Sequence, residues 1–483
     1  MPGNPSDLDG LGLAELVATK QASPAELLDE ALSRAEAAQA HLNCFSALYP
    51  DLARAQIEAG NLSGPYAGVP FLIKDLGVEV SGAPMTYGSR AFKGYVASCD
   101  STLTERFRKA GLVFFGATTT PEFGLTLTTE SSLYGQTRNP WDITRTTGGS
   151  SGGAAVAVAA GVIPVAHASD GGGSIRIPAA CCGLVGLKPS RGRMPMGPAR
   201  TESWNGLSTV GVVSRTVRDT AAMLDQTHGP ETGSRYAAPP VARPYLSELG
   251  DDPRPLRIAY WPVAPNGTRP DADAAEGLAN TVKLLESLGH IVVEAAPLLD
   301  GESLGKAALF TISANIAAGI DERSAALGRP VTEDELEPVT FSMANLGRTV
   351  PMVELAKANN TFIAAAVQYE HFLNAGQFDL TLSPTLHRAP DLLGTMALTA
   401  DPQAMGAAVS SFAAHCALFN QTGCPAISLP LHWTKPTATA PQGLPLGMMF
   451  GARYGREDLL ISLAGQLERA APWAQRKPPV WVG

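Results

Sequence analysis

Two segments rich in serine and glycine near the middle of the chain have the composition of a nucleophile site. The first covers 146–153 and reads TTGGSSGG, and the second covers 169–178 and reads SDGGGSIRIP. Ser150 lies in the first segment and Ser174 in the second. Consecutive glycines let the backbone point several N–H groups at one spot, which is how an oxyanion hole is built beside a nucleophile. The pattern therefore predicts nucleophilic chemistry at a serine.

A serine hydroxyl is a weak nucleophile and needs a neighbouring base. The chain has eight histidines, none in a recognisable motif, and each is interpreted as a packed or surface imidazole. The alternative base is a lysine with a lowered pKa. Lys74 follows the apolar run 69–73, where burial of a strand end would disfavour its charged form. Because a lysine at a strand end is more often a solvated tip, the pattern alone leaves the base open.

The first segment also matches the Gly-x-Ser-x-Gly nucleophile elbow twice, at 148–152 and at 149–153. That motif requires a strand immediately before it and a helix after it. The apolar run 154–160 is typical of a helix, but the preceding segment 139–145, NPWDITR, is polar and contains a proline. No strand is expected there, so the sequence disfavours a Ser–His–Asp hydrolase.

The elements that must position these residues alternate between helix and strand, which indicates an α/β layered fold. A capping box at Ser23–Glu26, with Pro24 at the first helical position, begins a helix. The expected helices are 10–45, 216–226, 274–288, 302–328, 351–375 and 456–470. The expected strands are 113–116, 256–260, 291–294, 378–382, 426–429 and 445–450.

We interpret residues 1–483 as a single domain. It comprises a helical region at about 1–60, a core at about 61–228, a linker at 229–256 rich in proline and glycine, and an α/β portion at 257–483. The linker is either a domain boundary or an excursion from one sheet.

Composition excludes several classes of protein. The formal net charge of −9 disfavours a nucleic-acid partner. Six scattered cysteines predict reduced thiols, and no metal site is expected because the sequence has neither a CxxC pair nor an HExxH helix. The N-terminus lacks the pattern of a signal peptide, and no continuous apolar run reaches the ~20 residues that a bilayer requires. A cytoplasmic protein without a membrane partner is expected.

Taken together, the motifs resemble the amidase signature family, and the resemblance covers nearly the whole chain. They are GGSSGG at 148–153, DGGGSIRIPA at 170–179, GLVGLKP at 183–189 with Gly192-Arg193, GVP at 68–70 with Lys74-Asp75, TPEFG at 120–124, TRNPW at 137–141, Gly423 with Pro425, Ala426, Ser428 and Pro430, and GLPLG at 443–447. The segments 165–173, 188–193 and 454–460 look most similar to a bacterial branch that includes 6-aminohexanoate-cyclic-dimer hydrolases and urethane-cleaving enzymes.

The resemblance implies a large, mixed, twisted β-sheet with helices on both faces, and a Ser–Ser–Lys triad. Ser174 matches the nucleophile, Ser150 the bridging serine after a cis peptide bond, and Lys74 the base. By the same resemblance, Gly171, Gly172 and Gly173 form the oxyanion hole, Gly149, Ser151, Asp170 and Arg176 support the site, and Thr128, Thr129 and Glu130 lie near the substrate. Ser169 stands where many relatives carry threonine, and we expect this difference to affect the shape of the pocket rather than catalysis.

The implied activity is hydrolysis of a linear or cyclic non-peptide amide through an acyl-enzyme on Ser174, releasing an amine or ammonia. The implied mechanism requires no metal or cofactor. The small-molecule substrate is an amide or a carbamate. A carbamate hydrolase or an esterase would use the same triad, and a non-catalytic binding subunit is the alternative of another class. The segments 303–320 and 335–352 diverge most from the family pattern and are expected to shape the pocket. A monomer or a homodimer is expected.

Overall fold

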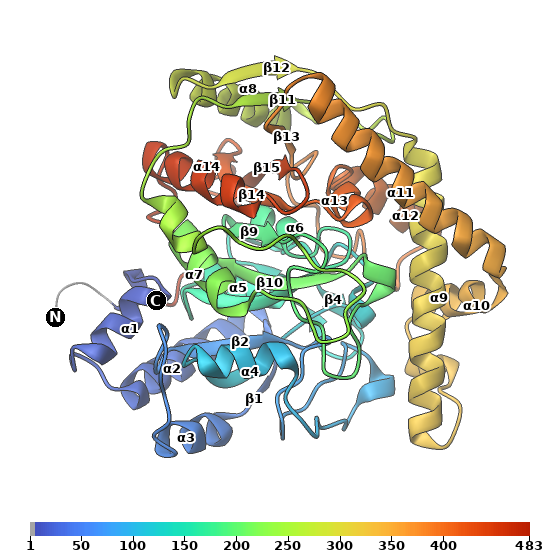
Figure 1. The fold of residues 1–483 in the computed structure, drawn as a ribbon. Coiled ribbons are helices and arrows are strands. Elements are labelled where there is room, and N and C mark those ends of the chain that lie inside the picture. The colour runs from blue at the N-terminus through green and yellow to red at the C-terminus, as the bar shows by residue number, and fades with distance from the viewer. Residues whose placement is uncertain (1–4) are drawn as a thin grey trace.

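A mixed eight-stranded β-sheet runs through the centre of the computed structural model, which describes residues 5–483 (Figure 1). The strand order is β12-β11-β13-β15-β14-β9-β10-β8. The strands are β8 Val165–Asp170, β9 Val185–Lys188, β10 Thr209–Ser214, β11 Arg257–Tyr260, β12 Ile291–Glu294, β13 Leu380–Pro384, β14 Ala426–Trp433 and β15 Pro445–Ala452. Strand β11 is parallel to β12 and β13, and every other neighbouring pair is antiparallel.

Helices cover both faces of this sheet, as the α/β/α expectation requires. Successive side chains of a strand point to opposite faces. In β15, Met448 lies against Gly277 of α8 (Ala272–Ser287), whereas the sulfur of Met449 lies 3.4 Å from Arg176 of α6 (Arg176–Cys182). Helices α8 and α6 therefore occupy opposite faces, and the predicted mixed α/β class is confirmed.

A second, three-stranded sheet brings Lys74 to the main sheet. Its order is β1-β3-β2, with β1 Phe45–Leu48, β2 Pro70–Lys74 and β3 Val113–Thr118. All residues of β2 are buried, and β2 packs beside β8, where the backbone N–H of Lys74 donates to His167 Nδ1 at 3.2 Å. This packing places Lys74 beside the strand that ends at Asp170.

The amphipathic helices follow the sequence prediction closely. The capping box predicted at Ser23–Glu26 is present and begins α2 (Pro24–Leu42). The region 10–45, predicted to be helical, contains α1 (Gly10–Ala18) as well as α2, but its end was placed too far along the chain, because Phe45 already belongs to β1. The other helices are α3 Pro50–Glu58, α4 Thr102–Lys109, α5 Gly152–Ala159, α7 Val217–Thr227, α9 Gly301–Leu327, α10 Pro338–Thr349, α11 Met352–Ala375, α12 Pro402–Phe412, α13 Cys416–Thr422 and α14 Glu457–Ala470.

The segment 229–256 contains one short 3-10 helix, Tyr245–Leu249. Strands β8–β10 precede this segment and β11–β15 follow it, yet all belong to one sheet. The segment is therefore a connection between two parts of the same sheet.

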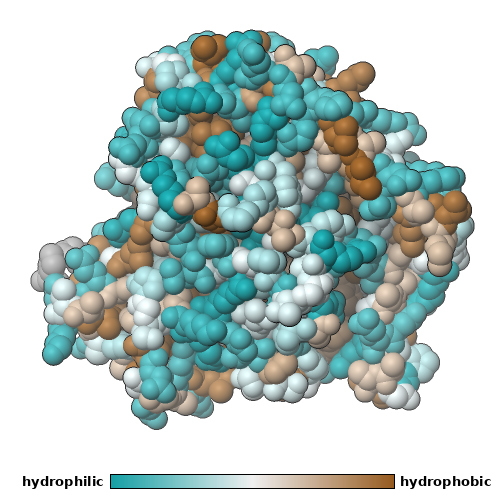
Figure 2. Space-filling model, viewed as in Figure 1, coloured by the Kyte–Doolittle hydropathy of each residue, from teal (hydrophilic) through white to brown (hydrophobic). Residues whose placement is uncertain are grey.

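Helix α9 stands beside the core with α10 and α11 packed against it (Figure 1). Within residues 5–483 it is the one helix that is long and apolar enough, by length and composition, to cross a bilayer. Only 39% of its most apolar stretch is buried, and a core helix of a soluble protein meets the same criterion. Polar residues interrupt its apolar ones, so the sequence of this helix contains no continuous apolar run of that length. Figure 2 shows a mostly hydrophilic surface with an apolar streak over α11.

Candidate active site

Lys74 is fully buried, and its amine contacts two serines. Lys74 Nζ lies 2.7 Å from Ser150 Oγ and 3.0 Å from Ser169 Oγ. Burial lowers the pKa of Lys74 to about 7, although the charge of Asp170 acts in the opposite direction. A large fraction of this lysine is therefore uncharged at neutral pH, so its lone pair can accept a proton from a serine hydroxyl. The solvated strand tip that periodicity favoured is not what the structure shows.

The loop that carries Ser150 is held by contacts that only glycine allows. The Gly149–Ser150 peptide bond is cis, as the family resemblance implies. A Cβ on Gly149 would lie 2.4 Å from the carbonyl oxygen of Thr128, and one on Gly152 would lie 2.2 Å from the hydroxyls of Thr129 and Thr147. These close approaches explain the glycines on either side of the two serines.

Ser151 and the start of α5 face inward rather than toward a ligand. Ser151 Oγ donates to the carbonyl oxygen of Ser169 at 3.1 Å and accepts from its N–H at 3.3 Å. The N–H of Gly152 donates to Thr129 Oγ1, and that of Gly153 donates to the carbonyl of Thr119. Ser151 thus joins the two serine-rich segments to each other.

Ser174 lies at the wall of a cavity, immediately after the turn 171–173. Its side chain makes no hydrogen bond with any part of the chain that the structure describes, and the same holds for the backbone N–H groups of Gly171, Gly172 and Ser174. The N–H of Gly173, by contrast, donates to Asp170 Oδ1 at 2.7 Å. Of the three glycines predicted to form the oxyanion hole, Gly171 and Gly172 have free donors, and Ser174 supplies a further one.

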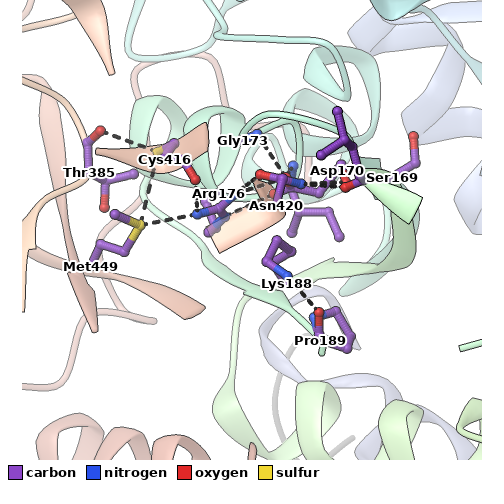
Figure 3. Close-up of polar contacts among 12 residues, drawn as sticks. Ser169, Asp170, Gly173, Arg176, Lys188, Pro189, Thr385, Cys416, Asn420 and Met449 are labelled. Atoms are coloured by element: carbon purple, nitrogen blue, oxygen red, sulfur yellow. Dashed lines mark hydrogen bonds and ion pairs between the residues drawn. The ribbon is translucent and has the colours of Figure 1, made fainter. Parts of the chain in front are cut away.

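Asp170 is the centre of a buried polar network behind this turn (Figure 3). Arg176 Nη2 and Nε contact its two carboxylate oxygens at 2.9 and 3.0 Å, and Asn420 Nδ2 donates to Oδ1 at 2.9 Å. Burial alone would raise the pKa of Asp170, but the charge and hydrogen bonds of Arg176 hold it far below its usual range. The carboxylate is therefore permanently charged and fixes the N–H groups of Gly173 and Ile175.

Thr128, Thr129 and Glu130 hold the serine loop in this structure. Thr129 Oγ1 donates to the carbonyl of Gly148 at 2.9 Å, and Thr128 Oγ1 donates to Glu130 Oε1 at 2.7 Å. Glu130 also accepts the N–H of Gly394. None of the three lines the cavity at Ser174, and their contact with substrate stays a prediction.

The expectation that no strand precedes the first serine segment is wrong. Strand β7 (Asp142–Thr146) pairs with β6 (Arg138–Asn139) directly before the loop, and α5 directly follows it. The strand was missed because its side chains are polar and partly exposed. Ser150 nevertheless differs from an elbow nucleophile, since its hydroxyl contacts Lys74 and none of the eight histidines lines the cavity.

The cavity has a volume of about 390 Å³ and reaches Ser150, Ser169 and Ser174. Ser169 therefore belongs to the site through both Lys74 and the cavity. An effect of this position on the pocket was expected, but its contact with Lys74 was not. Five aromatic residues line the walls: Tyr87, Phe92, Tyr95, Phe123 and Trp204. Helix α9 contributes Asn315 and Ile316, so the divergent segment 303–320 does shape the cavity, whereas 335–352 does not line it. No group of metal-ligating side chains is present in residues 5–483.

Comparison with known proteins places this chain in a family. Residues 26–461 match the Amidase family. The 6-aminohexanoate-cyclic-dimer hydrolase of Pseudomonas sp. (strain NK87) is 38% identical over 482 residues, which cover 97% of this chain and 96% of that protein. The structure of a 6-aminohexanoate cyclic dimer hydrolase complexed with substrate is 36% identical, with a TM-score of 0.93 over 99% of this chain and 100% of the other.

A more distant structure has the same fold. A bacterial aryl acylamidase of the amidase signature enzymes is 26% identical, with a TM-score of 0.86 over 97% of each chain. The chain therefore belongs to the amidase signature family and is an amidase-type hydrolase.

Proposed function

We propose that this protein hydrolyses a carboxamide C–N bond through an acyl-enzyme on Ser174, with Ser150 and Lys74 as a proton relay. The contact between Lys74 Nζ and Ser150 Oγ at 2.7 Å, in a fully buried site, carries the proposal. Burial supplies a neutral amine at neutral pH, and the adjacent serine gives that amine a proton donor. A binding subunit without catalysis would have no need of either feature.

In the first half of the reaction, Ser174 Oγ attacks the carbonyl carbon and passes its proton to Ser150. Ser150 in turn passes a proton to the lone pair of Lys74. The free N–H groups of Gly171, Gly172 and Ser174 are the donors for the negatively charged oxygen. The proton then returns through Ser150 to the substrate nitrogen, the C–N bond breaks, and an amine or ammonia leaves.

Water completes the reaction by the same relay. It attacks the acyl carbon while its proton moves toward Lys74, and the proton returns to Ser174 Oγ when the acyl–oxygen bond breaks. The relay works in both directions because a group with a pKa near 7 gains and loses a proton readily at neutral pH. Asp170 and Arg176 do not take part; they hold the turn that supplies the donors.

Amides are favoured as substrates because some of the full-length relatives are 6-aminohexanoate-cyclic-dimer hydrolases, and the ring of such a dimer is closed by amide bonds. Carbamates and esters present the same carbonyl to the same groups. To separate them, kcat/KM is compared for an anilide, a carbamate of the same aniline and an ester of the matching phenol. The highest kcat/KM for the anilide would support an amidase. A kcat/KM for the carbamate that equals or exceeds that for the anilide would make a carbamate the preferred substrate.

The first test is Ser174→Ala. We expect kcat for the anilide to fall by at least about 10³-fold, as when other triad members are removed, while the circular dichroism spectrum stays unchanged. Ser410→Ala, at an exposed serine of α12, is the matched control and should keep wild-type activity. Activity of Ser174→Ala within tenfold of wild type would remove Ser174 from the mechanism.

A further inference from the structure

Three of the aromatic residues that line the cavity have a left-handed backbone. The φ angles are 57° at Tyr87, 50° at Phe123 and 50° at Trp204. This region is sterically costly for bulky side chains, and only seven non-glycine residues of 5–483 adopt it. Residues in such conformations persist where surrounding contacts fix them, and they cluster at ligand sites. The left-handed backbone at these three positions thus fixes the direction in which the aromatic side chains enter the cavity.

Tyr87 and Phe123 form one wall together with Phe92. The ring centroids of Tyr87 and Phe92 are 4.6 Å apart, and those of Phe92 and Phe123 are 5.8 Å apart. The backbone N–H of Phe123 donates to the carbonyl of Tyr87 at 2.8 Å, and Ser131 Oγ donates to the carbonyl of Gly88. The two left-handed turns are therefore joined directly.

Trp204 forms a separate wall, and three side chains from other elements fix its turn. Arg191 Nε donates to the carbonyl of Gly206 at 2.6 Å, and Asn420 Nδ2 donates to that of Leu207 at 3.0 Å. From α9, Asn315 Nδ2 donates to Asn205 Oδ1 at 2.7 Å. Asn420 also donates to Asp170, so one amide group connects the Trp204 turn to the turn 171–173, called the oxyanion turn below.

The indole of Trp204 lies directly on the oxyanion turn. A Cβ on Gly171 would lie 2.6 Å from Trp204 Cζ3 and 2.7 Å from Cε3, closer than real carbon contacts. The backbone of Gly171 is not left-handed, so its conformation does not require glycine. Glycine at position 171 therefore leaves the space that the indole occupies. The indole lies next to the N–H groups predicted to bind the oxyanion.

We propose that Trp204, seated on Gly171, is a specificity-determining residue of the hydrolytic site. Together with the Tyr87–Phe92–Phe123 wall it gives the cavity a fixed, aromatic-lined shape beside the scissile carbonyl. Such a site accepts a flat or unbranched substituent, for example an aryl ring or a methylene chain, and rejects one that is branched next to the amide. This inference rests on the proposed function, because it concerns the substrate of Ser174.

The substrate test uses two pairs of amides, one pair branched or unbranched at the acyl carbon and the other at the carbon bonded to nitrogen. We expect wild type to prefer the unbranched member, and Trp204→Ala to raise the relative kcat/KM of the branched member at least tenfold in one pair, mainly through KM. The preference of Trp204→Phe for the unbranched member should lie between those of wild type and Trp204→Ala. If Trp204→Ala had the preferences of wild type in both pairs of amides, the proposal about Trp204 would be overturned. The proposed Ser–Ser–Lys mechanism would be unaffected by that result.

A second measurement needs no turnover and so separates this inference from the proposed function. Gly171→Ala should lower Tm clearly when Trp204 is present but much less in the Trp204→Ala background, because the added methyl group then finds space. Gly305→Ala is the matched control, because position 305 is exposed on α9 and an added Cβ would have no atom within 4 Å. Its effect on Tm should be the same with and without Trp204. Equal losses of Tm for Gly171→Ala in both backgrounds would contradict the contact, even if no amide is turned over.

Discussion

At the scale of single residues, Lys74 owes its chemistry to its surroundings rather than to its place in the sequence. The run 69–74 predicted a strand that ends in a lysine, and it left open whether the amine was solvated. Strand β8 and helix α5 pack against β2 and bury that amine, which no local pattern encodes. The resemblance to a family predicted the role of a base for Lys74, which periodicity left open. Which N–H groups near Ser174 are free likewise depends on Asp170, whose carboxylate takes that of Gly173.

The pH dependence of the reaction tests Lys74 as the base. Burial lowers its pKa to about 7, so the protonated, inactive form dominates below that pH. We expect kcat/KM to fall about tenfold per pH unit below pH 7 and to level off above it. Lys188 is the matched control, because burial also lowers its pKa to about 7, but within residues 5–483 its Nζ donates a hydrogen bond to the carbonyl of Pro189 and to no serine.

Lys188→Met should therefore keep the acid limb of the profile in place, whereas Lys74→Ala should lose most activity at every pH. A flat profile between pH 5 and 9 for wild type would exclude Lys74 as the base. An acid limb that disappears in Lys188→Met would assign the titration to the wrong lysine.

At the scale of secondary structure, helices with a periodic pattern and strands with an apolar run were predictable, whereas buried strands of small or polar residues were not. The capping box and the amphipathic pattern placed α2, α8 and α14 to within a few residues. Strands β8 and β9 were missed because their sequences, VAHASD and VGLK, are small or polar yet buried on both faces, so no alternation marks them. The Gly/Ser-rich centre was recognised as a site but not as the strands and helices that carry it.

Arg176 is the residue on which these central elements depend. It joins the end of β8, the start of α6 and the helix α13 through Asp170, Cys416 and Asn420. Arg176→Met leaves the buried carboxylate of Asp170 without its cation, which typically costs about 3–5 kcal/mol of unfolding free energy. Urea unfolding at pH 7 measures this loss.

The control for Arg176→Met is Arg348→Met, which removes an exposed ion pair with Asp321 and should cost less than about 1 kcal/mol. Similar losses of stability in the two variants would show that the network at Asp170 is not the buried charge cluster that the distances describe.

At the scale of the whole molecule, strands that precede and strands that follow 229–256 form one sheet. The site lies where three separate parts of the chain meet. Lys74 comes from β2, the serines from the central segment, and the cavity wall at Ile316 from α9. The α/β class was predictable from alternating elements. The cavity was not, although each left-handed aromatic residue is followed within two positions by a glycine: Gly88, Gly124 and Gly206.

The six cysteines test the packing of the whole chain. All are unpaired in the structure; Cys99 is exposed and the other five are buried, with burial raising the thiol pKa of Cys416 and Cys424 to about 12. Ellman's reagent should titrate one thiol in the native protein and six after denaturation, and reductant should leave Tm unchanged. Rapid native reaction of several thiols, or a Tm that falls with reductant, would contradict this packing.

The most direct test of the central claim is to trap the acyl-enzyme. The protein is mixed with p-nitrophenyl acetate, quenched in acid and mapped by peptide mass spectrometry. We predict a single acetyl adduct on Ser174 in wild type, and none at that position or elsewhere in Ser174→Ala. An adduct on Ser150 or Ser169, or hydrolysis of the ester without any covalent adduct, would contradict Ser174 as the nucleophile.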